Sequence, residues 1–156
     1  MPKKKKPKKK KVEYEDYQIE VQDWQADYSF LINKGKNFFN GVYSEYASII
    51  VTGKILFPDL GKTKQARIDL VGDPEKDDHW QAKPSIASAD SIGYTQMLRG
   101  DETLSFFAHI PMRALPHIAV TLNSSKIKYI SIYGTKLKWK RGTITNISLT
   151  TVQEEE

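Results

Sequence analysis

Cysteine is absent from this chain of 156 residues, and its absence removes three kinds of chemistry at once. Disulfide bonds, a thiolate nucleophile and cysteine-ligated zinc all need the thiol group, so none of them operates here. Long apolar runs are also missing, because no stretch approaches the roughly 20 residues that a membrane-spanning helix needs. The amino-terminal residues are charged and no apolar segment follows them. We therefore expect a cytoplasmic location, or a nuclear one if the source is eukaryotic.

Histidine is scarce, and the familiar catalytic motifs are missing. The three histidines are His79, His109 and His117, and their spacing does not match any helical metal-binding pair. The chain has no phosphate-binding P-loop, no dinucleotide fingerprint and no Gly-x-Ser-x-Gly elbow. His109 and His117 stand among apolar residues, so we expect both to be buried and hydrogen-bonded. These observations favour a protein without a catalytic site, a metal or a cofactor.

Positive charge is concentrated in residues 1–12, which we predict to be a disordered lysine-rich tail. Eight of the 24 basic residues lie there, which leaves 16 basic residues against 19 acidic ones in the rest of the chain. Like charges repel and prolines interrupt the run, so the tail cannot collapse into a fold. We expect it to bind polyanions, either nucleic acid or an acidic protein; a tail that only keeps the protein soluble is the alternative. Its lysines are Lys3, Lys4, Lys5, Lys6, Lys8, Lys9, Lys10 and Lys11.

Residues 13–152 are predicted to form a single β-rich domain, and residues 153–156 a frayed acidic end. Apolar residues alternate with polar ones in about eight segments, a period of two that is typical of half-buried strands. The segments are 17–23 with its continuation 28–32, 46–57, 66–70, 92–98, 104–110, 126–133, 136–140 and 143–152. Short spacing and Gly/Asn/Pro turns predict a mainly β fold, either an antiparallel β-sandwich or a partly closed barrel. Gly53 inside the longest segment indicates a bulge or a close backbone approach.

One short α-helix is predicted at about 112–123. Its apolar residues fall on one stripe at helical spacing, and they are Met112, Leu115, Ile118, Ala119 and Leu122. Pro116 is compatible with this helix, because a first-turn N–H has no partner within a helix. We expect the helix to begin between Met112 and Leu115 and to cover one end of the sheet.

The segment 136–140 alternates lysine with apolar residues, and we predict a strand there with turns at 134–135 and 141–142. Leu137 and Trp139 would then face the core. The opposite side would carry a ridge of three lysines, which commonly protect an edge strand from pairing with another chain. These lysines are Lys136, Lys138 and Lys140.

The connection 71–90 has no clean hydrophobic period, and loops of this length inside a compact domain are usually functional or disordered. It contains a candidate site of Asp77, Asp78, His79 and Trp80. Carboxylates at positions 73, 75 and 77 alternate in a way that can wrap a hard cation. The glycine and the distal glutamate of a calcium-binding loop are missing, however. We expect a solvated acidic loop without a metal ion.

Three classes of function are compatible with this sequence. We favour a non-catalytic β-rich binding or adaptor module whose lysine tail engages a polyanion non-specifically. The second class is a structural subunit that self-associates into homo-oligomers through sheet edges or exposed aromatic residues. The third is an enzyme with a loop-borne site near 77–80, because a fold can host many activities and sequence does not show which loop residues converge.

Overall fold

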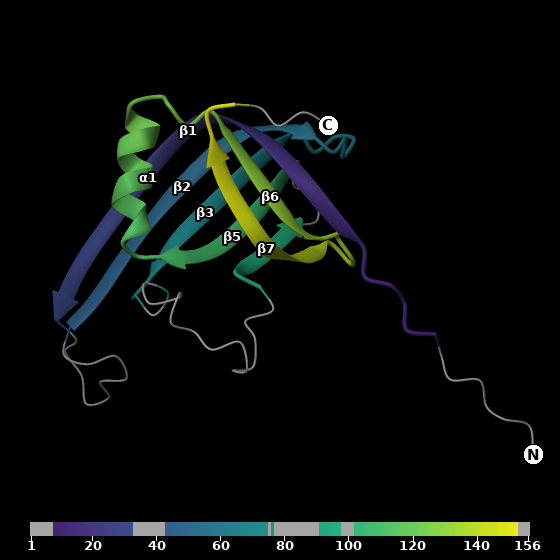
Figure 1. Cartoon of the computed structure of the whole chain (residues 1–156), viewed down its shortest axis with the longest axis horizontal. Helices are drawn as coiled ribbons and strands as arrows, with labels where there is room; N and C mark the ends of the chain where they lie inside the picture. Colours follow the sequence, from purple (N-terminus) through teal and green to yellow (C-terminus); the bar gives the residue numbers. More distant parts are fainter. Residues whose placement is uncertain (1–7, 33–42, 75, 77–90, 98–101, 153–156) are drawn as a thin grey trace, which may run out of the picture.

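The computed structural model describes residues 8–32, 43–74, 76, 91–97 and 102–152. Within these ranges the chain forms seven strands and one short helix (Figure 1). The helix, α1 (Ala114–Asn123), lies between the fifth and sixth strands in the chain. The strands are β1 (Tyr14–Ile32), β2 (Tyr43–Phe57), β3 (Gln65–Asp73), β4 (Gly93–Met97), β5 (Thr103–Pro111), β6 (Tyr129–Thr135) and β7 (Arg141–Thr150).

The strands form one mixed sheet that closes into a ring in the order β1-β2-β3-β5-β4-β7-β6. Closure is achieved by β1, which pairs with β2 along one edge and with β6 along the other. The prediction of a mainly β fold with one short helix is confirmed, and the sheet is a closed ring, not two packed sheets. One pair, β3 with β5, is parallel, whereas the other six are antiparallel. The parallel pair arises because β5 inserts between β3 and β4 and so runs beside a strand of its own direction.

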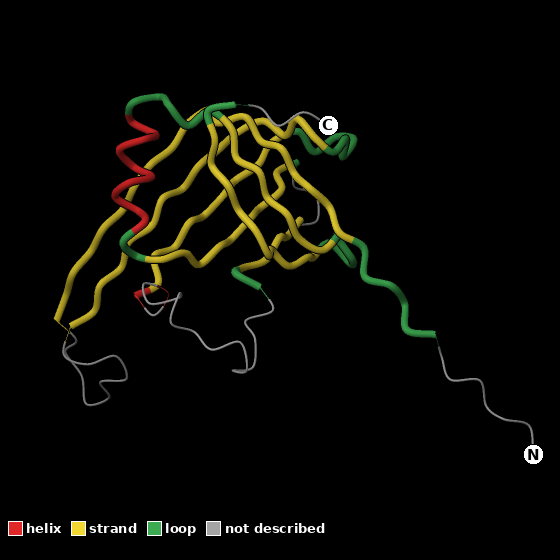
Figure 2. Tube along the Cα trace, viewed as in Figure 1, coloured by secondary structure: helices red, strands yellow, loops and turns green. Residues whose placement is uncertain are grey.

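A two-stranded arm extends beyond the ring. β1 is one continuous strand of 19 residues: Tyr14–Glu20 pair with β6, whereas the pairing with β2 runs from Gln18 to Ile32. β2 likewise pairs with β3 only from Ser48 onward. We call residues 28–32 and 43–47 the arm, because there β1 and β2 pair only with each other. The arm lies at the lower left of Figures 1 and 2, whereas residues 8–13 leave the ring on the opposite side.

Gly53 lets β1 and β2 approach each other closely. A Cβ atom at this position would overlap the carbonyl oxygen of Glu20 on the neighbouring strand. The β1–β2 register shifts between Val21 and Asp23, beside the position that Gly53 occupies. Of the two alternatives predicted at Gly53, the close backbone approach is therefore confirmed, and the register shift lies on the opposite strand, β1.

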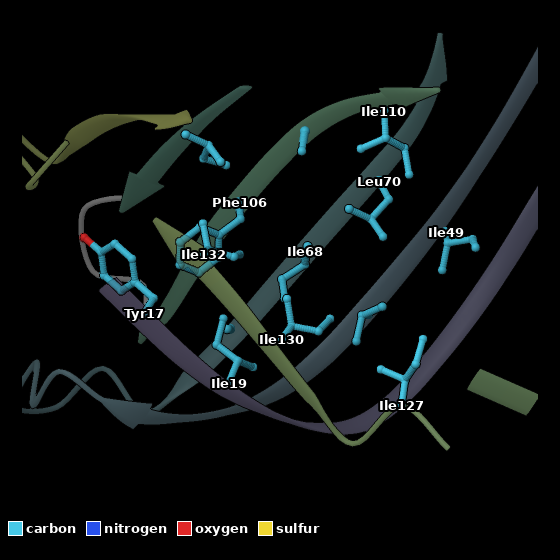
Figure 3. Packing of buried hydrophobic residues seen from close by; sticks show 14 of the residues in the cluster. Tyr17, Ile19, Ile49, Ile68, Leu70, Phe106, Ile110, Ile127, Ile130 and Ile132 are labelled. Carbon is cyan, nitrogen blue, oxygen red and sulfur yellow. The ribbon is translucent and has the colours of Figure 1, made fainter. Parts of the chain in front are cut away.

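The inside of the ring is filled by alternate residues of the strands, as Figure 3 shows. β5 supplies four buried side chains, Leu104, Phe106, Ala108 and Ile110, as the period of two predicted for the segment 104–110 requires. Tyr17 of β1 packs against Phe106 edge to face, with the ring centroids 5.1 Å apart. Burial, with a smaller contribution from the negative charge of Glu15, raises the pKa of Tyr17 to about 12. The phenol therefore stays protonated in the folded protein well above neutral pH.

The helix packs over the ends of β3 and β5. Leu115 and Leu122 are buried, and the other three residues of the predicted stripe are partly buried against the same core. Gly72 leaves room for the helix, since a Cβ there would lie 2.6 Å from the sulfur of Met112. The helix begins at Ala114, within the expected interval. Among the described residues no helix has both the length and the apolar character that a membrane span requires.

The segment 136–140 is a connection between β6 and β7, so the prediction of a strand there is wrong. The expected turns at 134–135 and 141–142 belong to β6 and β7 instead. Leu137 is partly buried against the core, but Trp139 is 89% exposed and does not face it. The reason lies in ring closure: β6 already pairs with β1 on one side and β7 on the other, so no edge remains for an additional strand.

Candidate functional site

The lysine tail joins the fold beside the connection between β6 and β7. Lys136 donates its backbone N–H to the carbonyl oxygen of Glu13 at 2.9 Å, and its ammonium group lies 3.6 Å from the Glu13 carboxylate. A hollow of about 430 Å³ lies here, which we call the basic groove. The fold thus brings cations from two distant parts of the sequence to one place. The cationic residues that line the groove are Lys10, Lys11, Lys136, Lys138 and Arg141.

The ion pair between Lys136 and Glu13 leaves the groove open to a ligand. Both side chains are more than half exposed. An exposed pair of this kind contributes only about 0–1 kcal/mol, because water and salt screen it. A phosphate group can therefore replace the carboxylate as the partner of Lys136 at little cost.

Lys138 and Arg141 flank a two-residue hairpin turn. The Lys138 N–H donates to the carbonyl oxygen of Arg141 at 2.8 Å, and the Arg141 N–H donates to that of Lys138 at 3.1 Å. The two residues between them, Trp139 and Lys140, have φ angles of 55° and 63°. Two successive positive φ angles are typical of a type I′ turn, whose preferred sequences are Asn-Gly and Asp-Gly. Tryptophan and lysine are thus unfavourable residues for the conformation that they adopt here.

Trp139 carries a conformational cost that packing does not offset. The left-handed region brings a side chain's Cβ close to the following carbonyl oxygen, which costs roughly 1–2 kcal/mol. Trp139 is 89% exposed, so the burial of its side chain contributes little stabilisation to offset this cost. Strained residues that persist without a structural benefit are candidates for a functional role. The chain therefore presents an exposed indole between two lysines at the tip of a hairpin.

Two further hollows continue the basic groove along the ring. The first, of about 530 Å³, shares Thr135 and Arg141 with the basic groove and reaches Tyr94 on β4. The second, of about 360 Å³, shares Tyr94 with the first and reaches His109 on β5. We call the three hollows together the outer track. It runs from the lysine tail across β7 and β4 to β5.

An aromatic surface lies along the outer track. Tyr94 is 49% exposed and stacks on Phe107 of the adjacent strand, with ring centroids 5.3 Å apart and ring planes 18° apart. Phe107 in turn contacts the imidazole of His109 edge to face at 5.1 Å. Phe107 thus holds Tyr94 in a fixed orientation while one side of the phenol ring stays open to solvent.

Two histidines, His109 and His117, do not occupy the environments that their sequence neighbours indicated. His109 on β5 and His117 on α1 are both exposed, so the expectation that they are buried is wrong. In a strand, adjacent side chains point to opposite faces, so the apolar neighbours Ala108 and Ile110 face the core while His109 faces out. His117 lies on the outer side of α1, because an amphipathic helix turns its apolar residues to the core and its polar residues to solvent.

The candidate loop site at Asp77, Asp78, His79 and Trp80 lies outside the described residues and stays a prediction, as do the tail positions Lys3–Lys6. Lys8–Lys11 are described, and all four are exposed. Asp73, the first carboxylate of the alternating set, ends β3 and is half-buried. Within the described part of the chain no group of three or more His, Asp or Glu side chains could hold a metal ion.

The arm is a second surface with unusual properties. Phe30 and Tyr43 stack across its two strands, with ring centroids 5.3 Å apart. A hollow of about 470 Å³, lined by Met112 and Leu115 among others, lies between α1 and the base of the arm. Exposed apolar residues gather on both strands, and they are Tyr28, Phe30, Leu31, Ile32, Tyr43 and Tyr46.

No protein-family model matches this chain, and neither does any curated protein or solved structure. Arg141 and Tyr94 are residues of the site that the sequence did not indicate, because their positions depend on the order of strands around the ring. The run Lys-Trp-Lys-Arg at 138–141 is a local signal of a basic and aromatic surface, although its alternation also resembles that of a strand.

Proposed function

We propose that this chain is a non-catalytic binding module that engages polyanions through the lysine tail and the basic groove together. The observation that carries this proposal is the meeting of tail and hairpin cations in one hollow, with Lys10 and Lys11 beside Lys138. Each phosphate that a cation neutralises releases condensed counterions, which favours binding without sequence preference. Nucleic acid and acidic protein segments are the ligands of matching charge.

The distribution of charge supports a localised site. Outside the tail, 16 basic residues face 19 acidic ones, so the body of the protein has a small negative net charge. A body of this charge does not attract polyanions over its whole surface, and binding depends on where cations gather. The guanidinium of Arg141 adds a planar pair of donors that fits a phosphate in two-point contact, which the tail lysines alone do not offer.

Removing two cations of the basic groove should weaken binding and make it less sensitive to salt. We expect the double variant Lys138→Gln/Arg141→Gln to lower the slope of log affinity against log salt by roughly 1.4 on single-stranded DNA, about 0.7 for each lost contact. A chain that begins at Val12 should lose a further part of the slope, because it lacks the tail lysines. Fluorescence anisotropy with a labelled oligonucleotide at several salt concentrations measures both effects.

The matched control is Lys126→Gln/Lys128→Gln. These lysines are exposed and lie just before β6, at the opposite end of that strand from the basic groove. The control also removes two positive charges, but away from the basic groove, so it should leave the salt slope nearly unchanged. If both double variants reduce affinity equally, the site is not localised. If the chain from Val12 binds as tightly as the full chain, the tail takes no part.

Self-association is the second candidate function, and the arm favours it. In the described structure residues 28–32 of β1 have β2 as their only strand neighbour, so one backbone edge is unpaired. Unpaired edges with apolar side chains are templates for pairing with another strand. We propose that the partner is a second copy of this chain, because identical edges pair antiparallel about a two-fold axis.

Polar substitutions on the arm should convert an associating protein to a monomer. We expect the full chain to sediment as a dimer at micromolar concentration and Phe30→Ser/Tyr43→Ser to sediment as a monomer, because the variant loses the apolar contact area. Both residues are more than half exposed, so the fold should tolerate the change. Val120→Ser, which alters an exposed residue of α1, is the control. A wild-type chain that is monomeric at 100-fold higher concentration would rule out this candidate.

A further inference from the structure

We infer that the basic groove and Trp139 bind single-stranded nucleic acid, with an unpaired base stacked on the exposed indole. This inference rests on the proposed polyanion function and specifies its ligand. It starts from the conformation of the hairpin: an indole is held at a type I′ position that suits asparagine, and it is 89% exposed. Neither backbone preference nor core packing explains a tryptophan at this position, whereas contact with a ligand does.

Stacking distinguishes a single strand from a duplex. In a duplex the bases stack on one another, so their faces are not available to a protein side chain. A single strand exposes these faces, and aromatic residues beside a positively charged groove bind them without sequence preference. Lys138 and Lys140 flank the indole in the chain, and Arg141 follows them. Cationic residues are therefore adjacent to the indole in the chain, and two of them, Lys138 and Arg141, also line the basic groove.

The outer track provides a path for the neighbouring nucleotides. It leads from the basic groove past Thr135 and Thr143 to the open face of Tyr94. Hydroxyl groups can donate hydrogen bonds to phosphate and sugar oxygens. Tyr94, held in orientation by Phe107, offers a second aromatic surface along the same path. Cationic, hydroxyl and aromatic side chains thus follow one another along this path, and they can contact phosphate, sugar and base respectively.

An anionic membrane is the competing ligand, since tryptophan and lysine also gather at membrane interfaces. The structure favours a nucleic-acid strand for two reasons. The basic groove is a hollow lined by five cationic side chains, whereas a lipid surface is contacted by a protruding apolar face. The hairpin also exposes one large apolar side chain, Trp139, and Leu137 beside it is packed against the core.

The test uses the full chain with Trp139→Asn, which keeps every charge. Asparagine tolerates positive φ, so the melting temperature should stay the same or rise. The affinity for a labelled oligothymidine of about 16 nucleotides should fall roughly tenfold, the effect of losing one stacked base. The affinity for a duplex of the same length should change less than twofold, and the salt slope should not change. Trp139→Phe keeps an aromatic face and should restore most of the lost affinity.

Four other outcomes would contradict the inference, and each identifies which part of it is wrong. If Trp139→Asn binds oligothymidine like the wild type, or loses single strand and duplex equally, no base stacks on the indole. If it loses only binding to vesicles that contain phosphatidylserine, the ligand is a membrane. If the wild-type chain binds neither oligonucleotide at low salt, the proposed function fails together with this inference. If the wild type binds both and Trp139→Asn has no effect, this inference alone fails.

Discussion

Replacing Phe106 with alanine should lower the free energy of unfolding by about 3–5 kcal/mol. Phe106 is 1% exposed at the centre of the ring, and it packs against Tyr17 at 5.1 Å. Its removal leaves a cavity that the ring cannot easily close, because β5 pairs with β3 on one side and with β4 on the other. Urea denaturation followed by circular dichroism measures the change.

Phe107→Ala is the matched control, since the two phenylalanines are adjacent in β5 and point to opposite faces. Phe107 is partly exposed and stacks on Tyr94, so its loss should cost about 0.5–1.5 kcal/mol. At a temperature where both variants are folded, Phe106→Ala should bind nucleic acid like the wild type, because it does not line the outer track. Equal destabilisation by the two substitutions would show that the assignment of inner and outer faces is wrong.

The features of the fold that the sequence predicted are those that local periodicity determines. Alternation with a period of two placed Leu104 and Phe106 on one face of a strand, and the helical stripe from Met112 to Leu122 identified α1. Gly53 was recognisable because a glycine inside a long apolar strand usually marks a close backbone approach. Each of these signals lies within one element and requires no knowledge of its neighbours.

The order of strands around the ring was not predictable in the same way. Insertion of β5 between β3 and β4, and closure through β1 and β6, depend on pairings between distant segments. The misplaced strand at 136–140 has the same origin: its alternation of lysine with Leu137 and Trp139 is genuine, but ring closure leaves no edge for it. A glycine followed by threonine at 134–135 predicts a turn, whereas Gly134 lies inside β6.

The candidate site was predictable only in part. The lysines of the tail are evident from composition, and the expectation that they bind polyanions follows from electrostatics alone. Their meeting with Arg141 is a consequence of the β1–β6 pairing, which brings residues 13 and 136 together. The aromatic residues of the outer track were not indicated, because a tyrosine on a strand looks the same whether it faces the core or the solvent.

Replacing Gly134 with alanine should destabilise the fold by about 3 kcal/mol and also weaken polyanion binding. A Cβ atom at this position would overlap the carbonyl oxygen of Thr143 and lie 3.1 Å from the Cα of Ile144. The β6–β7 pair would have to separate, which adds the loss of a ladder hydrogen bond, about 1 kcal/mol, to the cost of steric overlap. Chemical denaturation gives the first effect, and anisotropy at a temperature where the variant is folded gives the second.

The polyanion affinity of Gly134→Ala should fall, because the β6–β7 pair positions the hairpin that carries Lys138 and Arg141. Gly53→Ala is the control: it creates a similar overlap with the carbonyl oxygen of Glu20, but on β2, away from that hairpin. It should be comparably destabilising while the affinity of the folded fraction stays at the wild-type value. If folded Gly134→Ala keeps the wild-type affinity and salt slope, the position of the hairpin is irrelevant and the tail lysines alone bind. If it loses affinity while Gly53→Ala does not, the fixed geometry of the basic groove contributes to binding beyond the charge that it contains.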